Sequence, residues 1–308
     1  MYKIISMDLD ETLLTSDKIM TGSFKPFVKK LKDNNYLPVI ATGREYFSAK
    51  RFVGDVDIDL ICNNGNIIRN NLTGEVKYIN PIKKEDLDEV MSFDTNDNVY
   101  STLHVSRDDG INLVYKKKGF KTFDKTYVYA FDGRNEGVDD FNDFKGTPLS
   151  IVFAGHFDEL SDMKNRMEEK LSDRFNFHIM KIRREPKWML EVLQKNGDKF
   201  FGVKEYAENK NVDMKEVLAI GDDSNDKMLI EGAGLGIAMI NAVDILKEAA
   251  DLISDYDNNN DGAVKILDKI LFGWFYEYKL VSRSYEKDHW GYWKKIKTCR
   301  FLYRNYWF

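Results

Sequence analysis

The segment Lys3-Ile4-Ile5-Ser6-Met7-Asp8-Leu9-Asp10-Glu11-Thr12 passes from a short apolar run directly into acidic residues. The apolar run predicts a buried strand that ends where the polar residues begin. Because side chains alternate along an extended chain, Asp8 and Asp10 can project to the same side, with the amide of Leu9 between them. One carboxylate could then attack phosphorus while the second protonates the leaving oxygen. A solvated acidic loop after a strand is the alternative.

Short apolar runs and amphipathic stretches alternate on both sides of a central region. In the first part, strands are expected at 3–7, 37–41 and 58–62, with helices at 24–32 and 46–53. After residue 190, helices are expected at 199–208, 226–231 and 242–249, and strands at 217–220, 235–239 and 251–253. This alternation predicts an α/β fold in which both parts form one Rossmann-like parallel sheet.

The region between these two parts has a different pattern. Hairpin-like strands are expected at 111–117 and 149–154, together with a helix at 157–171. A chain of 308 residues usually exceeds one compact core. We therefore expect a catalytic core of residues 1–81 and 188–271, an inserted α+β cap of residues 82–187, and a C-terminal extension of residues 272–308. Because ligands of open α/β sheets bind beyond the carboxyl ends of the strands, the cap would roof the site.

Composition narrows the class of protein. Hydrophobic residues make up 43% and charged residues 31% of the chain, the balance of a globular protein. A net charge of −5 disfavours nucleic acid as the main partner. No apolar run is long enough for a signal peptide or a transmembrane segment, so we expect a cytoplasmic protein. The two cysteines, Cys62 and Cys299, have no zinc or disulfide pattern and are expected to be structural thiols.

Two further segments carry groups that suit a phosphoryl ligand. The second predicted strand ends in Thr42-Gly43-Arg44, where a hydroxyl and an accessible glycine amide could hold phosphoryl oxygens. Taken alone, such a pair is more often a helix entry. Lys199 begins a predicted helix, where the helix dipole disfavours a cation. A bound phosphoryl group would account for this lysine, and an exposed surface lysine is the alternative.

Gly221-Asp222-Asp223-Ser224-Asn225-Asp226 follows the strand predicted at 217–220 and places three carboxylates within five residues. Like charges this close need a cation or protonation, although an N-capping turn would explain Asp223 and Ser224 individually. Mg²⁺ is favoured over zinc because no cysteine or histidine lies nearby in the sequence. If these groups converge with Asp8 and Asp10 near Lys199, the metal would also allow a phosphate dianion to bind.

With these four motifs in this order, the sequence resembles the haloacid dehalogenase superfamily of phosphohydrolases, in particular its Cof-type branch with a large α/β cap. The resemblance covers about residues 1–271, and its last motif is Ala233-Gly234-Leu235-Gly236-Ile237-Ala238-Met239-Ile240-Asn241-Ala242, followed by Ala250-Asp251. It implies a Mg²⁺-dependent phosphatase that hydrolyses small cytosolic phosphomonoesters, such as sugar phosphates or phosphorylated cofactors, through an aspartyl-phosphate intermediate.

The resemblance also implies roles for individual residues. Asp8 would be the nucleophile and a metal ligand, and Asp10 would be the general acid/base and bind the metal through its carbonyl. Asp222 would complete the metal site, and Lys199 would stabilise the transferred phosphoryl group together with the metal. The groups that hold the phosphoryl oxygens would be Leu9 through its amide, Thr42, Gly43, Lys199 and Asn225. The supporting residues would be Thr12, Arg44, Asn64 and Asp226.

The sequence departs from the family pattern at two positions. Glu11 stands where relatives often have glycine, and Glu45 replaces a common proline after Arg44. Neither change removes a catalytic group, so the reaction is expected to be retained, while loop conformation and substrate access could differ. The polar candidates for substrate contact in the cap are His104, Arg107, Asp108, Asp109, Asn112 and Tyr115.

Two segments do not belong to these motifs. Residues 257–268 approach an EF-hand loop, with Asp257, Asn259, Asp261 and Gly262 at matching positions, but Asp268 stands where glutamate is required. We expect a turn there. The extension 272–308 mixes aromatic and basic residues, a composition that could suit a membrane interface or single-stranded nucleic acid. We expect it to pack on the core or on a second subunit instead.

Three functions remain open from the sequence. The first is a phosphatase that acts on a small phosphorylated molecule. The second is a phosphomutase of similar fold, which would return the phosphoryl group to its substrate. The third is a non-catalytic protein that binds a partner through the extension, although intact Asp8, Asp10, Lys199 and Asp222 argue against it.

Overall fold

The apolar run at the start of the chain lies in the middle of a large sheet. In the computed structural model, β1 (Ile4–Met7) pairs in parallel with β12 (Val217–Gly221) on one side and β2 (Leu37–Ala41) on the other. The structure describes residues 2–95, 98–117, 133–181 and 187–273, and the backbone of residues 278–287 and 293–302. Within these residues, the strand order is β14-β13-β12-β1-β2-β3-β4-β5. The other strands are β3 (Asp59–Cys62), β4 (Ile67–Asn70), β5 (Val76–Ile79), β13 (Leu235–Ala238) and β14 (Leu252–Ile253).

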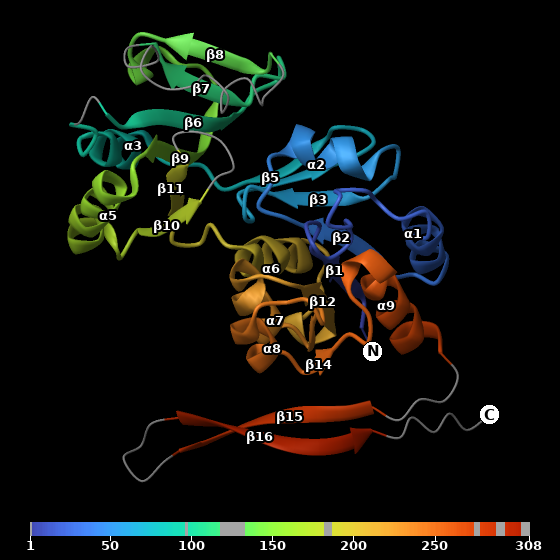
Figure 1. Cartoon of the computed structure of the whole chain (residues 1–308). Coiled ribbons are helices and arrows are strands. Elements are labelled where there is room, and N and C mark those ends of the chain that lie inside the picture. The colour runs from blue at the N-terminus through green and yellow to red at the C-terminus, as the bar shows by residue number, and fades with distance from the viewer. Residues whose placement is uncertain are drawn as a thin grey trace.

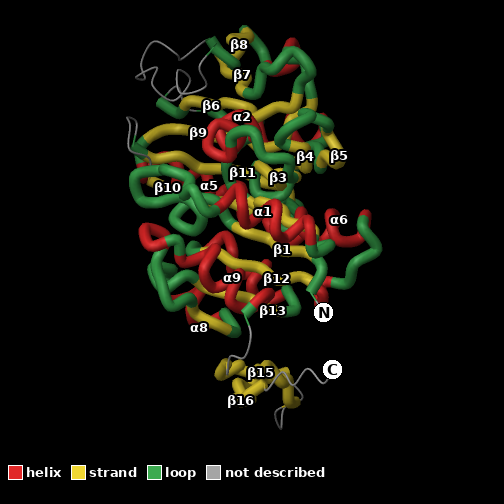
Figure 2. Tube along the Cα trace, turned by 90° about the vertical axis from the view of Figure 1, so that its right-hand side faces the viewer, coloured by secondary structure: helices red, strands yellow, loops and turns green. Residues whose placement is uncertain are grey.

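Helices cover both faces of this sheet. The helices are α1 (Phe24–Asp33), α2 (Tyr46–Val53), α6 (Lys199–Asn209), α7 (Lys227–Gly232), α8 (Asp244–Ala249) and α9 (Gly262–Phe272). Figure 1 shows α1 and α9 on one face and α6 and α7 on the other, and Figure 2 shows α1 and α9 in front of β1 and β12. The apolar positions of α1 recur at helical spacing, with Phe24, Phe27, Val28 and Leu31 buried, which is why this segment packs as an amphipathic helix.

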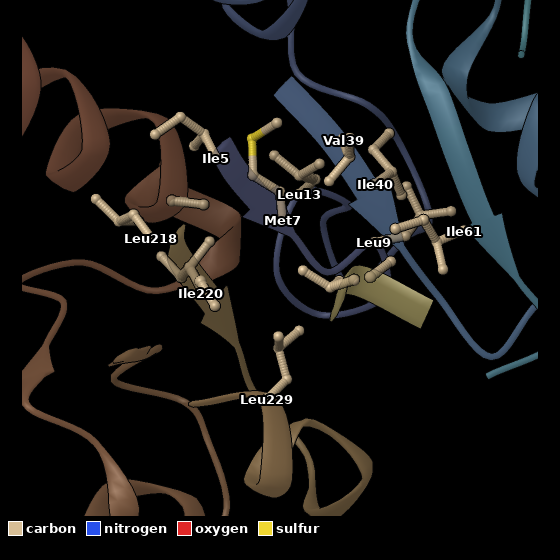
Figure 3. Close-up of a cluster of buried hydrophobic side chains, with 14 of the residues drawn as sticks. Ile5, Met7, Leu9, Leu13, Val39, Ile40, Ile61, Leu218, Ile220 and Leu229 are labelled. Carbon is tan, nitrogen blue, oxygen red and sulfur yellow. The ribbon is translucent and has the colours of Figure 1, made fainter. Parts of the chain in front are cut away.

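The central strands are buried on both faces because helices lie above and below them. Every residue of β1 and β12 is buried. Figure 3 shows Met7 of β1, Val39 of β2 and Ile220 of β12 in one apolar cluster. Burial of each such side chain contributes about 1.5–3 kcal/mol. This packing fixes the ends of the strands, from which the polar residues of the predicted site emerge.

A second sheet is inserted between β5 and α6. Its order is β10-β11-β9-β6-β7-β8, and its neighbours are antiparallel except for β7 and β8. The strands are β6 (Tyr100–Ser106), β7 (Leu113–Lys116), β8 (Asn135–Val138), β9 (Thr147–Gly155), β10 (Phe175–Lys181) and β11 (Trp188–Gln194). Its helices α3 (Lys84–Met91) and α5 (Phe157–Leu171) share a separate hydrophobic core with this sheet. The α/β fold class with an inserted α+β part is therefore confirmed.

Several details differ from the predictions. The large sheet is parallel from β14 to β3, but β4 and β5 add an antiparallel hairpin that the sequence did not indicate. The residues of β5 are exposed or half-buried, so the apolar alternation that marks a strand is weak there. Two helices begin later than predicted: the 3₁₀ turn η3 (Ser224–Asp226) precedes α7, which begins at Lys227, and the helix expected at 242 begins at Asp244. The other such turns are η1 (Phe141–Asp143), η2 (Met214–Glu216) and η4 (Asn258–Asn260).

The C-terminal extension contains an antiparallel pair of strands, β15 (Tyr278–Lys287) and β16 (Trp293–Leu302). The side chains of the extension beyond residue 273, including that of Cys299, lie outside what the structure describes, so the expected packing of its aromatic residues remains a prediction. The other cysteine, Cys62, is a buried free thiol. Among the described residues, the structure contains no helix with the length and apolar character needed to cross a membrane.

Candidate active site

Three neighbouring strands deliver polar residues to one edge of the large sheet. Met7 is in register with Ile220 on one side and with Ile40 on the other. The residues that follow these strands therefore lie close together, because parallel strands end at the same edge. This edge brings Asp8 and Asp222 to one place and sets Thr42 beside them.

Lys199 joins this group from α6. It is the first residue of the helix, its side chain is only 2% exposed, and Asp198 caps the helix by accepting a hydrogen bond from the Phe200 amide. The Lys199 ammonium lies 2.7 Å from Asp8 Oδ1 and 2.7 Å from Asp226 Oδ1. An exposed surface lysine is thereby excluded, and the cation instead compensates two buried carboxylates.

Close packing of two glycines allows the start of α6 to lie against the turn after β3. Gly65 has a φ of +94°, in the region that favours glycine, and a Cβ atom there would lie 2.3 Å from the Asp198 carbonyl oxygen. A Cβ atom on Gly202 would lie 2.5 Å from the Cα of Gly65. The turn after β3 and the first turn of α6 can approach this closely only because neither residue has a side chain. Lys199 depends on that approach for its position.

Asp8, Asp222 and Asp226 each offer a carboxylate oxygen, and these three oxygens lie within 4.8 Å of one another. Burial raises the pKa of Asp8 to about 6, although Lys199 and the Leu9 amide oppose the shift. Burial and then the charges of Asp8 and Asp226 raise the pKa of Asp222 to about 9. Burial is the main cause of both shifts, and the three carboxylates of the cluster lie together with one contacting ammonium, that of Lys199.

The Asp226 carboxylate binds both Lys199 and backbone amides of the loop after β12. Its Oδ2 accepts hydrogen bonds from the amides of Asp222 and Asp223 at 3.1 and 3.2 Å, while Oδ1 binds Lys199. The Thr12 hydroxyl donates to Asp222 Oδ1 at 3.2 Å. These bonds orient the carboxylates without neutralising them, so the cluster offers an all-oxygen site.

Asp10 has different partners from Asp8. Arg44 donates two hydrogen bonds to its carboxylate, at 2.6 and 2.7 Å, and the Lys18 ammonium lies 3.0 Å away. Burial raises the pKa of Asp10, but the hydrogen bonds and charges of Arg44 and Lys18 outweigh it and lower the pKa overall. The two carboxylates of the first motif therefore point to different partners in this structure. Lys18 was not identified from the sequence, because it lies in a loop without a motif and has a φ of +61°.

Three of the residues predicted to hold phosphoryl oxygens, Thr42, Gly43 and Asn225, lie around Asn64. The Asn64 amide donates to the Thr42 carbonyl at 3.1 Å, and a Cβ atom on Gly43 would lie 3.0 Å from Asn64 Oδ1. Asn225 donates to the same Oδ1 at 3.3 Å. The Arg44 amide donates to the Thr42 hydroxyl. Loops that are far apart in the sequence thus meet in one place.

The two departures from the family pattern have structural explanations. Glu11 adopts a φ of +51°, and its carboxylate accepts hydrogen bonds from Ser16, Lys18 and Asn258. These bonds offset the cost of a left-handed conformation that glycine would avoid. Glu45 caps α2 by accepting from the Phe47 and Ser48 amides. Both side chains hold loops in place and leave the acidic cluster intact.

The predicted cap residues have varied surroundings. Arg107 pairs with Asp109 and Glu136, and the Asn112 amide donates to Glu45 of the large-sheet part. His104 is buried, which lowers its pKa to about 4. Tyr115 is half-buried, and Asp108 lies in an exposed turn.

The segment that resembles an EF-hand begins with the 3₁₀ turn η4 (Asn258–Asn260), and its second half, from Gly262, is the start of α9. Asp257 Oδ1 accepts from the Asn260 amide, and Asp261 accepts from the hydroxyls of Thr21 and Ser23. The carboxylates of this segment therefore bind protein donors. The expected turn is therefore present in the first half of the segment only.

Sequence reasoning missed one more residue. Glu191 lies on β11, is 8% exposed, and accepts a hydrogen bond from Asn64 Nδ2 at 3.4 Å. A charged residue inside the apolar run Trp188–Gln194 was the available signal, because a buried strand seldom carries a carboxylate without a partner.

The sheet order, the inserted second sheet and the buried cluster of carboxylates and lysine at the strand ends define a Rossmann-like α/β protein with an inserted cap and a candidate enzyme site. The sequence model of haloacid dehalogenase-like hydrolases matches residues 5–267. The chain belongs to this family, and the resemblance drawn from the motifs is confirmed.

Several relatives of the chain are named as phosphatases. The chain is 25% identical to the 5-amino-6-(5-phospho-D-ribitylamino)uracil phosphatase YwtE of Bacillus subtilis, over 88% of this chain and 99% of the relative. It is 26% identical to the HMP-PP phosphatase of Yersinia enterocolitica, over 80% and 87% of the two chains. A haloacid dehalogenase-like hydrolase from Bacteroides thetaiotaomicron has the same fold, with a TM-score of 0.70, 24% identity and coverage of 88% and 100%. The protein is a phosphatase of the phosphoric monoester hydrolase class.

Proposed function

We propose that the protein is a Mg²⁺-dependent phosphatase that hydrolyses small phosphomonoesters through an aspartyl-phosphate intermediate on Asp8. The observation that carries this proposal is the buried cluster in which Asp8, Asp222 and Asp226 lie within 4.8 Å of one another and Lys199 contacts two of them. The substrate class follows from the relatives, two of which are named for a ribitylaminouracil phosphate. Sugar phosphates and phosphorylated cofactors belong to this class.

The acidic cluster fits a divalent metal. Its ligand atoms are oxygens of three carboxylates, two of which contact the Lys199 ammonium. The ligands would be the carboxylates of Asp8 and Asp222 and the carbonyl of Asp10. Mg²⁺ would supply positive charge that allows the phosphate dianion to approach.

The chain's own residues would then carry the chemistry. An Asp8 oxygen attacks phosphorus, the bond from phosphorus to the leaving oxygen breaks, and Asp10 gives its proton to that oxygen. In the second step, Asp10 takes a proton from water, whose oxygen attacks phosphorus and releases inorganic phosphate and Asp8. Lys199, Thr42, Gly43, Asn225 and the Leu9 amide would hold the phosphoryl oxygens. Because Asp10 must be protonated for the first step, its contacts with Arg44 and Lys18 have to loosen when substrate binds.

We further propose boundaries for the domains of the chain. Residues 1–81 and 188–271 would form the catalytic core, residues 82–187 the cap, and residues 272–308 an extension that could contact a second subunit or a partner. A cytoplasmic location would suit small phosphorylated metabolites.

The test is a phosphate-release screen over a panel of phosphorylated metabolites with Mg²⁺, with Asp8→Asn run beside the parent protein. We expect release of free phosphate from at least one substrate by the parent and a loss of at least about 10³-fold in the variant. Equal turnover by both proteins would disprove the nucleophile. Isomerised product without free phosphate would indicate a phosphomutase.

A further inference from the structure

The C-terminal hairpin needs a surface to pack against. Its strands β15 and β16 pair with each other from Tyr278↔Leu302 to Lys287↔Trp293 and form a sheet of two strands. A two-stranded hairpin is marginally stable at best in water unless an apolar face packs against another element. Residues 274–308 include 13 aromatic residues, which supply apolar area for such a contact. We therefore expect the hairpin to pack on another surface.

The edge strand β14 is the part of the large sheet next to this hairpin. Cα atoms of β15 lie within 8 Å of Cα atoms of β14. Figure 1 shows the hairpin below β14, and Figure 2 shows it below β13 and α8. Among the described strands, β14 ends the large sheet and pairs with β13 alone. An open sheet edge presents backbone donors and acceptors, and natural proteins commonly cover such an edge.

The end of α9 lies beside the same strand. Lys269, in the last turn of α9, forms an ion pair at 3.2 Å with Asp255, which lies two residues after β14. Only four residues separate Gly273 from the start of β15, and this connection spans at most about 18 Å. Such a short tether gives the hairpin a high effective concentration near β14 of its own chain. The covalent connection therefore favours β14 of the same chain over that of a second copy.

Exposed apolar side chains lie around β14. Ile253 on the strand is 47% exposed, and Tyr256 in the following turn is 51% exposed. Ile240 is also exposed, and its amide donates to the Ser254 hydroxyl at 2.9 Å, which joins its loop to this turn. We call Ile240, Ile253 and Tyr256 the β14 surface. Because these side chains stay exposed although β15 lies nearby, closer docking has apolar area left to bury.

The β14 surface and the extension have opposite charges. Residues 240–261 contain six acidic residues and one lysine, whereas residues 274–308 contain eight basic and three acidic residues. Within the first segment, Asp244, Glu248 and Asp255 are exposed. Opposite charges steer two surfaces together and disfavour wrong pairings. The basic extension therefore complements the acidic surroundings of the β14 surface.

We propose that the C-terminal hairpin docks on the β14 surface of its own chain and covers the open edge of the large sheet. Apolar side chains of the extension would bury Ile253 and Tyr256, and its basic residues would face the exposed carboxylates around β14. Docking would stabilise the hairpin, because its two strands gain a packing partner. This role of the extension is independent of the proposed phosphatase activity.

The test measures amide hydrogen exchange of the full chain by mass spectrometry, in peptides that cover β15 and β16. Ile253→Lys removes apolar area from the β14 surface and adds a charge that repels the basic extension. Ile253→Glu removes the same side chain but adds a charge that attracts the extension. The matched control is Val76→Lys, because Val76 is 40% exposed on β5 at the opposite edge of the same sheet. Thermal unfolding of each variant checks the core.

We expect the parent to protect the amides of the hairpin and Ile253→Lys to speed their exchange by at least about tenfold, with Ile253→Glu between the two. Exchange in Val76→Lys should stay within about twofold of the parent. Three results would overturn the proposal: equal exchange in Ile253→Lys and Val76→Lys, faster exchange in Ile253→Glu than in Ile253→Lys, or a parent hairpin that exchanges as fast as an unfolded chain.

Repeating the parent measurement at an about hundredfold lower protein concentration identifies the occupant of the β14 surface. Protection that does not change on dilution supports docking within one chain. Protection that is lost on dilution would assign the β14 surface to a second copy of the chain and would overturn the proposal.

Discussion

Lys199 is the residue on which the acidic cluster depends. Its ammonium sits between Asp8 and Asp226, and all three side chains are nearly inaccessible to solvent. Burial lowers the pKa of Lys199, but the two carboxylates outweigh this effect and raise it overall. Lys199 therefore remains charged at any pH at which the enzyme would work. Removing it would leave two buried carboxylates without compensation.

The first prediction concerns Lys199→Met in the absence of metal. We expect the free energy of unfolding to fall by about 3–5 kcal/mol at pH 7, because breaking a buried ion pair leaves an uncompensated charge. Urea denaturation measures the change. The matched control is Lys29→Met, which breaks an exposed pair with Asp33 and should cost less than about 1 kcal/mol. A similar cost for both variants would contradict this role of Lys199.

The second prediction concerns pH and Glu191. Burial raises its pKa from 4.5 to about 7 in the folded protein. A raised carboxyl pKa means that the folded state binds the proton more tightly, so this contribution to stability is present below pH 4.5 and is lost as the pH rises through 7. Relative to the parent, Glu191→Gln should therefore gain about 1–3 kcal/mol in unfolding free energy between pH 5 and pH 8. A difference that does not change with pH would show that Glu191 ionises normally.

At the scale of elements, the turn after β3 and the start of α6 act as one unit. Gly65 and Gly202 bring their backbones together, and this approach sets the position of Lys199 at the first residue of the helix. Any side chain at Gly65 would have to displace the Asp198 carbonyl. The effect should then reach the active site, although Gly65 itself contacts no catalytic group.

The third prediction compares Gly65→Ala with Gly54→Ala. Both residues have positive φ, but a Cβ atom on Gly54 would meet nothing within 4 Å. Gly54→Ala should cost about 1–3 kcal/mol of backbone strain, because its φ of 65° and ψ of −151° are nearly restricted to glycine, and should leave kcat unchanged. Gly65→Ala should cost more and lower kcat at least tenfold, because small displacements of a catalytic group are expensive. Equal kcat values for the two variants would show that α6 tolerates the shift.

Periodicity and strand-end chemistry predict most of the core from the sequence. The runs at 37–41 and 157–171 match β2 and α5 at both ends. The hairpin of β4 and β5 could not be predicted, because its outer strand lacks an apolar face. Contacts between side chains that are far apart in the sequence could not be predicted either. The ion pairs of Lys18 and Arg44 with Asp10 and the hydrogen bond from Asn64 to Glu191 are known only from the structure.

For the whole molecule, the site is assembled from both parts of the chain that flank the inserted sheet. Asp8 comes from the first part, while Lys199 and Asp222 come from the second. Contacts from the inserted sheet reach this assembly through Glu191 and through Asn112, which donates to Glu45. A ligand that neutralises the acidic cluster should therefore stabilise the fold as a whole.

The fourth prediction is that Mg²⁺ raises the thermal midpoint. At a concentration of about 100 times Kd, binding contributes about 2.7 kcal/mol, which corresponds to roughly 5 °C for a chain of this size. Differential scanning fluorimetry with and without Mg²⁺ measures the shift. Asp222→Asn should abolish it, whereas Asp257→Asn, in the turn before α9, should retain it. A shift that survives in Asp222→Asn would place the metal elsewhere.

The most direct test of the central claim is chemical trapping of the phosphorylated residue. The enzyme is quenched with acid during the first turnover, treated with borohydride, and digested for peptide mass spectrometry. Reduction of an aspartyl phosphate gives homoserine, so we predict homoserine at position 8, present only when substrate and Mg²⁺ are both supplied. Homoserine at another position, or unmodified Asp8 in an enzyme that turns over, would contradict the account.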